Sequence, residues 1–228
     1  MHGPSTRARE DYVKAIYQLG YAEPVRAADV ARHLGVTPVS VSKAKRMLER
    51  DGLLERSDRS MGPLVLSALG RELAVEMIRR HRLLETFLFR ALDVPLESIH
   101  AEAERIEHVI SNDIALRLAR YLGYPGVDPH GHVIPYRDED AREQRYTSLG
   151  EFPIATRFCV VSLDDRDPQA VRALAAEEVL PGFEGTLVAL DGEGAHVDAA
   201  GRTFSVARRH AALVRVVASY SAGTQRAE

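Results

Sequence analysis

The chain has 228 residues, of which 45% are hydrophobic and 28% charged, and its formal net charge is −3. These proportions are typical of a globular protein and exclude a disordered chain or a fibrous repeat. No apolar run approaches the roughly 18 residues that a membrane span needs, and the N-terminus lacks the apolar core of a signal peptide. The single cysteine, Cys159, cannot form an internal disulfide, so we expect a cytoplasmic protein without a membrane partner.

The charge is distributed unevenly along the chain. Residues 1–66 carry 11 Lys and Arg against 8 Asp and Glu, a net of +3. Because the whole chain carries −3, the remainder carries −6. A basic N-terminal part within an acidic chain favours a DNA-binding domain at that end.

The N-terminal pattern predicts a helix-turn-helix. Apolar residues recur at helical spacing over 5–19, and again over 25–34, where Gly35 provides a stop. Thr37 is a good N-cap and Pro38 suits the first position of a third helix, whose apolar face would run to Gly52. In a helix-turn-helix, the second helix of the pair, here the one that begins at Pro38, enters the major groove of DNA. Its polar face supplies our candidates for contact with bases: Thr37, Ser40, Ser42 and Lys43.

The segment that follows predicts a β-hairpin wing, with two short apolar runs around a charged turn between residues 53 and 67. We expect Arg46 and Arg50 of the third helix and Arg59 of the wing to contact phosphates. The alternative is a helical pair that only packs, with a solvated charged face. We favour DNA binding because turn, caps, polar face and wing all agree.

The middle of the chain predicts two long amphipathic helices, over 67–92 and over 96–123, followed by a Gly- and Pro-rich loop. Beyond about residue 149 the pattern changes to short strand-like runs separated by Gly and Asp turns. One short helix is expected within them, at 169–177. The fold class is therefore mainly α with a small all-β C-terminal domain.

Ionisable residues gather on the second of these long helices. Glu104, Glu107 and His108 lie at spacings of three and four, and His100 lies one turn earlier. His81 and Glu85 form another pair four residues apart. Such donors suit Mn²⁺, Fe²⁺, Co²⁺, Ni²⁺ or Zn²⁺. By spacing alone, a solvated helix face is the better interpretation.

Several segments in the same order resemble a known family. EDYVKAIYQL, SVSKAKRMLERDGLL, RRHRLLETFL and HAEAERIEHVIS, together with the DPHGHVIP loop, are similar to the diphtheria-toxin-repressor family of iron- or manganese-dependent regulators. The resemblance covers residues 5–136, and the β part resembles the SH3-like, FeoA-type domain of longer members. It implies a winged helix-turn-helix at 1–72, a helical dimerisation and metal-binding domain at 73–140, a linker at 141–150 and an SH3-like domain at 151–228.

The resemblance also implies which residues bind metal. The family's primary metal site falls on Asp11, Glu104, Glu107 and His108. Its ancillary site falls on His81, Glu85 and His100, to which the SH3-like domain would add Asp167 or Gln169.

The metal itself follows from the ligand types. Iron-responsive members use sulfur ligands at the positions of Asp11 and Glu104, so oxygen donors there imply Mn²⁺, with Fe²⁺ as the alternative and Zn²⁺, Co²⁺, Ni²⁺ or Cd²⁺ as ions that could occupy the sites in vitro. The manganese branch often has another carboxylate one turn after Asp11, where this chain has Lys14. That departure predicts one primary and one ancillary ion.

The resemblance implies a homodimer that binds a palindromic DNA operator when metal is bound, represses metal-homeostasis genes and has no small-molecule substrate. One alternative is a winged-helix regulator controlled by a small organic ligand. A metalloenzyme is the other: Glu97 and His100 form one Glu-x-x-His pair, but a di-iron bundle needs a second, and hydrolase motifs are absent from the sequence. We therefore expect no enzyme, and we expect the loop residues His130 and His132 to be solvated.

Overall fold

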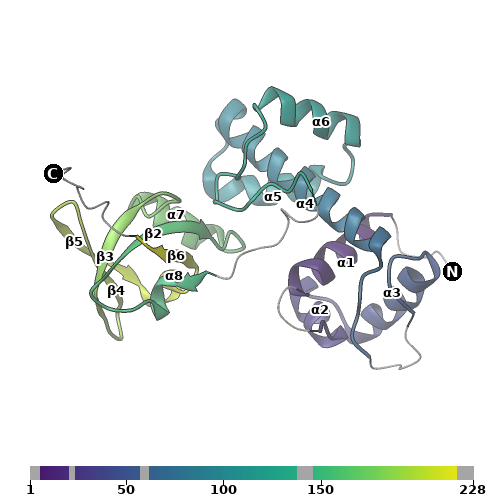
Figure 1. Cartoon of the computed structure of the whole chain (residues 1–228), viewed down its shortest axis with the longest axis horizontal. Helices are drawn as coiled ribbons and strands as arrows, with labels where there is room; N and C mark the ends of the chain where they lie inside the picture. The colour runs from purple at the N-terminus through teal and green to yellow at the C-terminus, as the bar shows by residue number, and fades with distance from the viewer. Residues whose placement is uncertain (1–5, 21–23, 57–61, 138–145, 220–228) are drawn as a thin grey trace, which may run out of the picture. The chain divides into compact units, whose positions relative to one another are not determined.

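The computed structural model describes residues 6–20, 24–56, 62–137 and 146–219, and it divides into two compact units (Figure 1). The first unit contains Met1–Leu84, Ala103–Gly126 and Val133–Glu143, and the second contains Glu85–Glu102, Val127–His132 and Gln144–Glu228. The second unit thus includes two segments of the predicted dimerisation domain. Within the described residues, no helix is long and apolar enough to cross a membrane.

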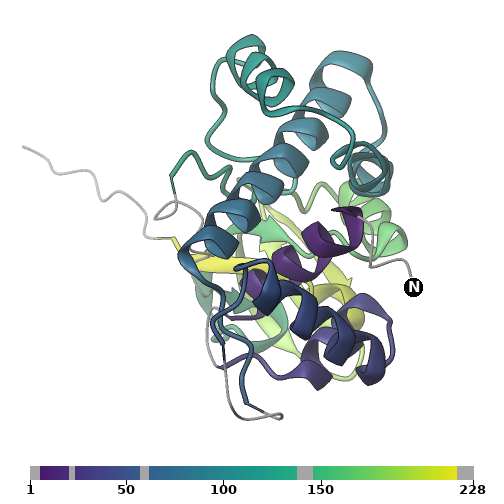
Figure 2. The ribbon, with the colours of Figure 1, turned by 90° about the vertical axis from the view of Figure 1, so that its right-hand side faces the viewer.

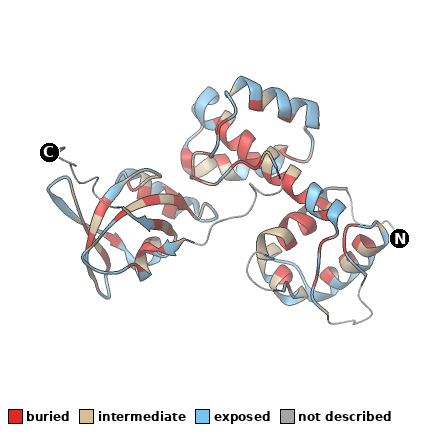
Figure 3. Ribbon diagram, in the orientation of Figure 1, coloured by how far each residue is buried: buried red, intermediate tan, exposed pale blue. Residues whose placement is uncertain are grey.

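The first unit begins with the predicted helices, α1 (Thr6–Leu19), α2 (Ala27–Leu34) and α3 (Pro38–Arg50). Their apolar faces meet in one core, in which Val13, Ile16, Val30, Val41 and Leu48 are almost fully buried (Figure 3). Burial of these faces is the main force that holds the short helices together, since helices of this length are marginal alone.

In the described part of the chain, the predicted β-hairpin wing is represented by two isolated β-bridges. Single antiparallel bridges join Val25 to Leu64 and Leu54 to Leu66, so the described residues contain paired positions here rather than long strands. Arg59 lies outside the described residues.

α4 (Ala68–Leu92) is one continuous helix (Figure 2), as expected from its periodicity. The predicted helix over 96–123 is wrong, because the structure divides it into α5 (Leu96–Ile106) and α6 (Asn112–Tyr121). The physical reason is Ser111, whose side-chain oxygen accepts a hydrogen bond from the backbone N–H of Ile114 and starts a new helix. Glu107 and His108 therefore lie in the turn directly after α5.

The second unit contains a six-stranded antiparallel sheet in the order β1-β6-β2-β3-β4-β5. Its strands are β1 (Thr147–Ser148), β2 (Thr156–Leu163), β3 (Glu184–Leu190), β4 (Gly194–Ala199), β5 (Arg202–Ala207) and β6 (Val214–Ala218). The helices α7 (Pro168–Ala176) and α8 (Arg208–Ala211), with the 3₁₀ turn η2 (Leu149–Glu151), complete the module. Phe158, Leu163, Leu187, Val197 and Val214 are fully buried in its core.

The mainly α fold with a C-terminal β part is confirmed. The predicted linker at 141–150 needs a correction, because Thr147 and Ser148 pair with Val216 and Arg215 and so belong to the sheet. Two residues of strand and a 3₁₀ turn are too short for a periodic signal in the sequence.

The cap of α3 provides a test of this part of the fold. Thr37 accepts a hydrogen bond from the backbone N–H of Ser40 at 3.2 Å. We expect Thr37→Ala to lower the free energy of unfolding by about 1 kcal/mol, the usual cost of losing such a cap. Urea unfolding of Thr37→Ala and Thr37→Ser would measure it, and equal losses in both variants would contradict the role of the cap.

Candidate metal centres and nucleic-acid interface

The exposed face of α3 carries the predicted DNA contacts. Thr37, Ser42, Lys43, Arg46 and Arg50 are exposed and Ser40 is partly exposed, while the opposite face is buried. Val39, which the sequence analysis did not single out, is 64% exposed near the start of this helix. An exposed apolar side chain at that position suits the methyl group of thymine. Its place on the polar face of α3 is the signal that could have identified it.

A cluster of metal donors joins α1 to the turn after α5 within the first unit. Ligand atoms of Asp11, Glu107 and His108 all lie within 4.8 Å of one another. The Nε2 atom of His108 lies 3.1 Å from Asp11 Oδ1 and 3.4 Å from Glu107 Oε1. The Nδ1 atom of His108 lies 2.7 Å from Glu10 Oε2. A carboxylate on the other ring nitrogen orients an imidazole for metal binding, and the sequence analysis missed this role for Glu10.

Asp11 lies on α1, which packs against α2 and α3, whereas Glu107 and His108 follow α5. The cluster therefore links the DNA-binding helices α1–α3 to the rest of the first unit. Burial raises the pKa of Asp11, against the opposing effect of the His108 charge. A divalent ion would favour the ionised carboxylate. Two carboxylates with an imidazole form a donor set that fits such an ion.

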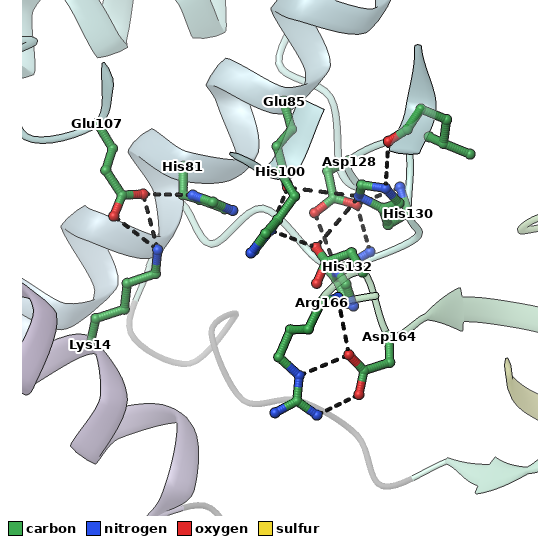
Figure 4. Close-up of polar contacts among 12 residues, drawn as sticks. Lys14, His81, Glu85, His100, Glu107, Asp128, His130, His132, Asp164 and Arg166 are labelled. Carbon is green, nitrogen blue, oxygen red and sulfur yellow. Dashed lines mark hydrogen bonds and ion pairs between the residues drawn. The ribbon is translucent and has the colours of Figure 1, made fainter. Parts of the chain in front are cut away.

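Glu107 is 1% exposed and has partners on both oxygens (Figure 4). The Lys14 ammonium donates to Oε1 and Oε2, each at 3.0 Å, and His81 Nδ1 lies 2.6 Å from Oε2. Burial would raise the pKa of Glu107, but the hydrogen bonds and charges of His81 and Lys14 lower it to about 2. Glu107 is therefore a carboxylate at every physiological pH.

The predicted primary site is partly assembled. Asp11, Glu107 and His108 come together, whereas Glu104 is exposed and lies outside this group of donors. His81, expected at the ancillary site, lies one turn before Glu85 on α4, and its Nδ1 contacts Glu107. Lys14 was noted in the sequence as a departure from the family, but its contact with Glu107 is a long-range one that spacing could not reveal.

A second cluster lies within the second unit. His100 Nδ1 lies 3.2 Å from Glu85 Oε1 (Figure 4). The same nitrogen lies 3.2 Å from Asp165 Oδ2. Burial would lower the pKa of His100, but its contacts with Asp165 and Glu85 raise it to about 10. Asp165 precedes α7, so the β module contributes a donor to this group, as expected.

The donor from the β module is a different residue from those predicted. Asp167 is the N-cap of α7, where its side chain accepts hydrogen bonds from the backbone N–H groups of Gln169 and Ala170. Gln169 is exposed. Asp165 occupies the place expected for these residues, because Asp167 is used as the cap and the loop before it turns toward His100.

The loop before the β module adds two buried donors to the second cluster. His130 is 0% exposed and Asp128 3% exposed, and ligand atoms of Glu85, Asp128 and His130 lie within 4.8 Å of one another. The expectation that His130 is solvated is therefore wrong, and His132 is only partly exposed. The loop is held in place by the His130 carbonyl, which accepts a bond from the backbone N–H of Leu163 on β2 at 2.9 Å.

One ring nitrogen of His130 is well placed to bind an ion. Its Nε2 lies 3.2 Å from the Leu96 carbonyl, a contact that fixes the ring. Its Nδ1 is buried and has no hydrogen-bond partner among the described residues, with Asp165 Oδ2 at 3.5 Å and Glu85 Oε1 at 3.7 Å. A buried nitrogen in that state is costly in an apoprotein. The donors around it fit a divalent cation.

Comparison with known protein families gave two adjoining matches. The family described as "Iron dependent repressor, N-terminal DNA binding domain" matches residues 5–60. The family described as "Iron dependent repressor, metal binding and dimerisation domain" matches residues 67–136. Together these matches cover more than half of the chain.

Among similar proteins, the iron-dependent repressor IdeR of Mycobacterium bovis is 40% identical over 129 residues, which are 55% of this chain and 54% of that protein. The match therefore spans about half the length of that relative. The diphtheria toxin repressor of Corynebacterium jeikeium is 32% identical over 181 residues, or 75% of this chain and 74% of that protein.

Solved structures match over more of the chain. A manganese-dependent transcriptional repressor in complex with manganese has a TM-score of 0.81 at 30% identity, covering 92% of this chain and all of that one. ScaR with bound Zn²⁺ has a TM-score of 0.75 at 26% identity, covering 95% of this chain and all of that one.

The raised pKa of His100 predicts a pH dependence in the metal-free protein. Its stabilising contribution is fully present below the ordinary value of 6.5 and falls as the pH rises toward about 10. In EDTA, urea unfolding should show the native chain more stable than His100→Gln at pH 6.5, with a difference that shrinks steadily up to pH 10. A difference that is constant over this range would contradict the ion pairing of His100.

Proposed function

The chain belongs to the iron-dependent repressor family, and from this membership we propose that it is a metal-activated, dimeric transcriptional repressor of metal-homeostasis genes, acting on DNA in the cytoplasm. The observation that carries the proposal is the position of Asp11. It lies on α1, in the DNA-binding part, and its Oδ1 faces His108 Nε2 of the turn after α5 at 3.1 Å. Neither part alone contains all the donors of this cluster.

We propose that Asp11, Glu107 and His108 hold the activating ion. An ion bound there supplies positive charge between carboxylates that would otherwise repel. Asp11 then holds α1 close to the turn after α5, and α1 packs against α2 and α3 through the shared core. In a dimer, α3 of each subunit must meet a half-site at a fixed spacing. The chain would exchange between a state with α1 held against the turn after α5 and a state with α1 released. The ion can shift this equilibrium only as far as it binds the first state more tightly than the second.

Glu104 remains a proposed fourth ligand. It lies one turn before His108, and its exposed side chain would have to turn inward to reach the ion. Carboxylate oxygens with imidazole nitrogen, without sulfur, are the reason to propose Mn²⁺ as the effector, with Fe²⁺ as the alternative. The manganese-dependent repressors among the structural neighbours support the same choice.

A second ion is proposed in the second unit, where Glu85, Asp128, His130 and Asp165 converge with His100 beside them. The support for it is the buried Nδ1 of His130 and the three carboxylates of Glu85, Asp128 and Asp165 close to it. His81, one turn before Glu85, stays a candidate ligand, as the sequence predicted. Asp167 is better explained as the cap of α7, and exposed Gln169 is retained only as a distant candidate.

For the operator, we propose that Thr37, Ser40, Ser42 and Lys43 approach base edges, and that Arg46 and Arg50 bind phosphates, as would Arg59 of the wing. The hydroxyls of Thr37 and Ser42 bond to their own helix at Ser40 N and Pro38 O, which holds them in fixed orientations. A homodimer would recognise a palindromic site.

Asp11 and Glu104 provide a matched test of the primary site. Asp11→Asn keeps the shape of a side chain that is 38% exposed, so we expect a folded protein that has lost the coupling between Mn²⁺ and the operator. Operator affinity measured by fluorescence anisotropy should rise roughly 5–150-fold from EDTA to Mn²⁺ in the native chain, the usual range of such coupling, and hardly at all in Asp11→Asn.

Glu104→Gln tests the proposed fourth ligand, whose carboxylate is exposed and lies outside the assembled group. Metal coupling close to that of the native chain would leave Glu104 out of the site. Operator binding that is equal in EDTA and Mn²⁺ for the native chain would refute the proposed function. A Glu104→Gln variant as defective as Asp11→Asn would show that Glu104 turns inward to complete the site.

The second ion has its own test. His130→Gln should bind about one fewer Mn²⁺ per chain than the native protein, because it removes the buried nitrogen donor. His132→Gln, whose imidazole lies 3.4 Å from Asp128 and is partly exposed, is the matched control. Equilibrium dialysis with elemental analysis would count the ions, and unchanged binding in His130→Gln would exclude this nitrogen as a ligand.

A further inference from the structure

Lys14 makes an unusual contact for a lysine on a DNA-binding domain. It belongs to α1, yet it is only 9% exposed. Its ammonium donates to both oxygens of Glu107 at 3.0 Å, across 93 residues of sequence. It therefore links the same two segments that Asp11 and His108 link, and it does so through a cation that is part of the chain.

Because both charges are buried, the loss of either Lys14 or Glu107 would be strongly destabilising. A buried ammonium or carboxylate without a partner is very costly, so removing either member of such a pair is strongly destabilising. Lys14 and Glu107 are both buried and each satisfies the other. While α1 is docked against the turn after α5, the attraction between the two charges offsets the cost of their burial, and loss of either charge would leave the other buried without this partner.

Lys14 also contributes to the balance of charge in this cluster. Glu10, Asp11 and Glu107 bring carboxylates to this place, and Lys14 contributes an ammonium that pairs with Glu107. The charge of Arg7 also lowers the pKa of Asp11, and protonated imidazoles or an added ion would supply further positive charge. Lys14 contacts both oxygens of Glu107, and Oε1 also lies 3.4 Å from His108 Nε2, which in turn lies 3.1 Å from Asp11 Oδ1.

We propose that Lys14 is a built-in cation that ties α1 to Glu107 without any metal, so that this cluster takes a single divalent ion on the side of Asp11 and His108. The first half concerns the metal-free chain alone. The second half rests on the proposed metal site. Metal then strengthens an existing link between the DNA-binding helices α1–α3 and the turn after α5. In the metal-free chain, α1 stays partly held against this turn by Lys14.

The first test measures backbone hydrogen exchange of α1 in the full chain in EDTA. In Lys14→Gln we expect the α1 amides to exchange at least roughly tenfold faster than in the native chain, because local opening no longer has to break a buried ion pair. Lys45→Gln is the control. Lys45 is also largely buried, and it forms its ion pair with Glu49 on its own helix, at 3.7 Å.

A double variant protects the test against simple misfolding. Glu107→Gln alone leaves a buried ammonium without its carboxylate, whereas Lys14→Gln with Glu107→Gln removes both charges. If the two residues act as one pair, the double variant should exchange no faster than Glu107→Gln alone. Native exchange in Lys14→Gln, or effects of the two substitutions that simply add, would overturn the proposal.

The second test counts ions. Lys14→Glu replaces the built-in cation by a carboxylate beside Asp11 and Glu107, so a divalent ion should take its place, and dialysis should find about one more Mn²⁺ per chain than in the native protein. The same number of ions in both would overturn the second half of the proposal. A native chain that binds no Mn²⁺ would instead refute the proposed function, and the exchange experiment in EDTA would still stand.

Discussion

The buried carboxylate of Glu107 is the group around which the DNA-binding part and the turn after α5 come together. It is buried in the turn after α5, and its oxygens are contacted by Lys14 and His81, with His108 beside them. A buried carboxylate must have cationic or hydrogen-bonding partners, and here one of those partners comes from α1. The need to satisfy this single charge therefore holds the DNA-binding part near the turn, beside the place proposed for the divalent ion.

The break between α5 and α6 is part of the same arrangement. Had the helix continued past Ile106, as the periodicity of 96–123 predicted, the chain would not turn at Glu107 and His108. Ser111 ends that possibility by capping α6. The signal was present in the sequence as a serine followed by Asn112 and Asp113, but an unbroken apolar stripe outweighed it in the prediction.

Local features were predictable from the sequence and long-range contacts were not. The helices α1 to α4, the Thr37 cap and the short strands follow from periodicity and turn residues. The grouping of Glu107 with His108 follows from spacing and resemblance. The contact of Lys14 with Glu107, the burial of His130 and the choice of Asp165 over Asp167 depend on how distant segments pack, which no local pattern contains. Glu104 illustrates the converse, since correct spacing did not bring its side chain into the cluster.

A crystal structure of the manganese-loaded chain, with anomalous diffraction to locate the metal, would test the central claim most directly. We expect an anomalous peak among Asp11, Glu107 and His108, with the Lys14 ammonium still within hydrogen-bonding distance of Glu107. Absence of metal from this cluster, or a Lys14 side chain displaced from Glu107 by the ion, would contradict it.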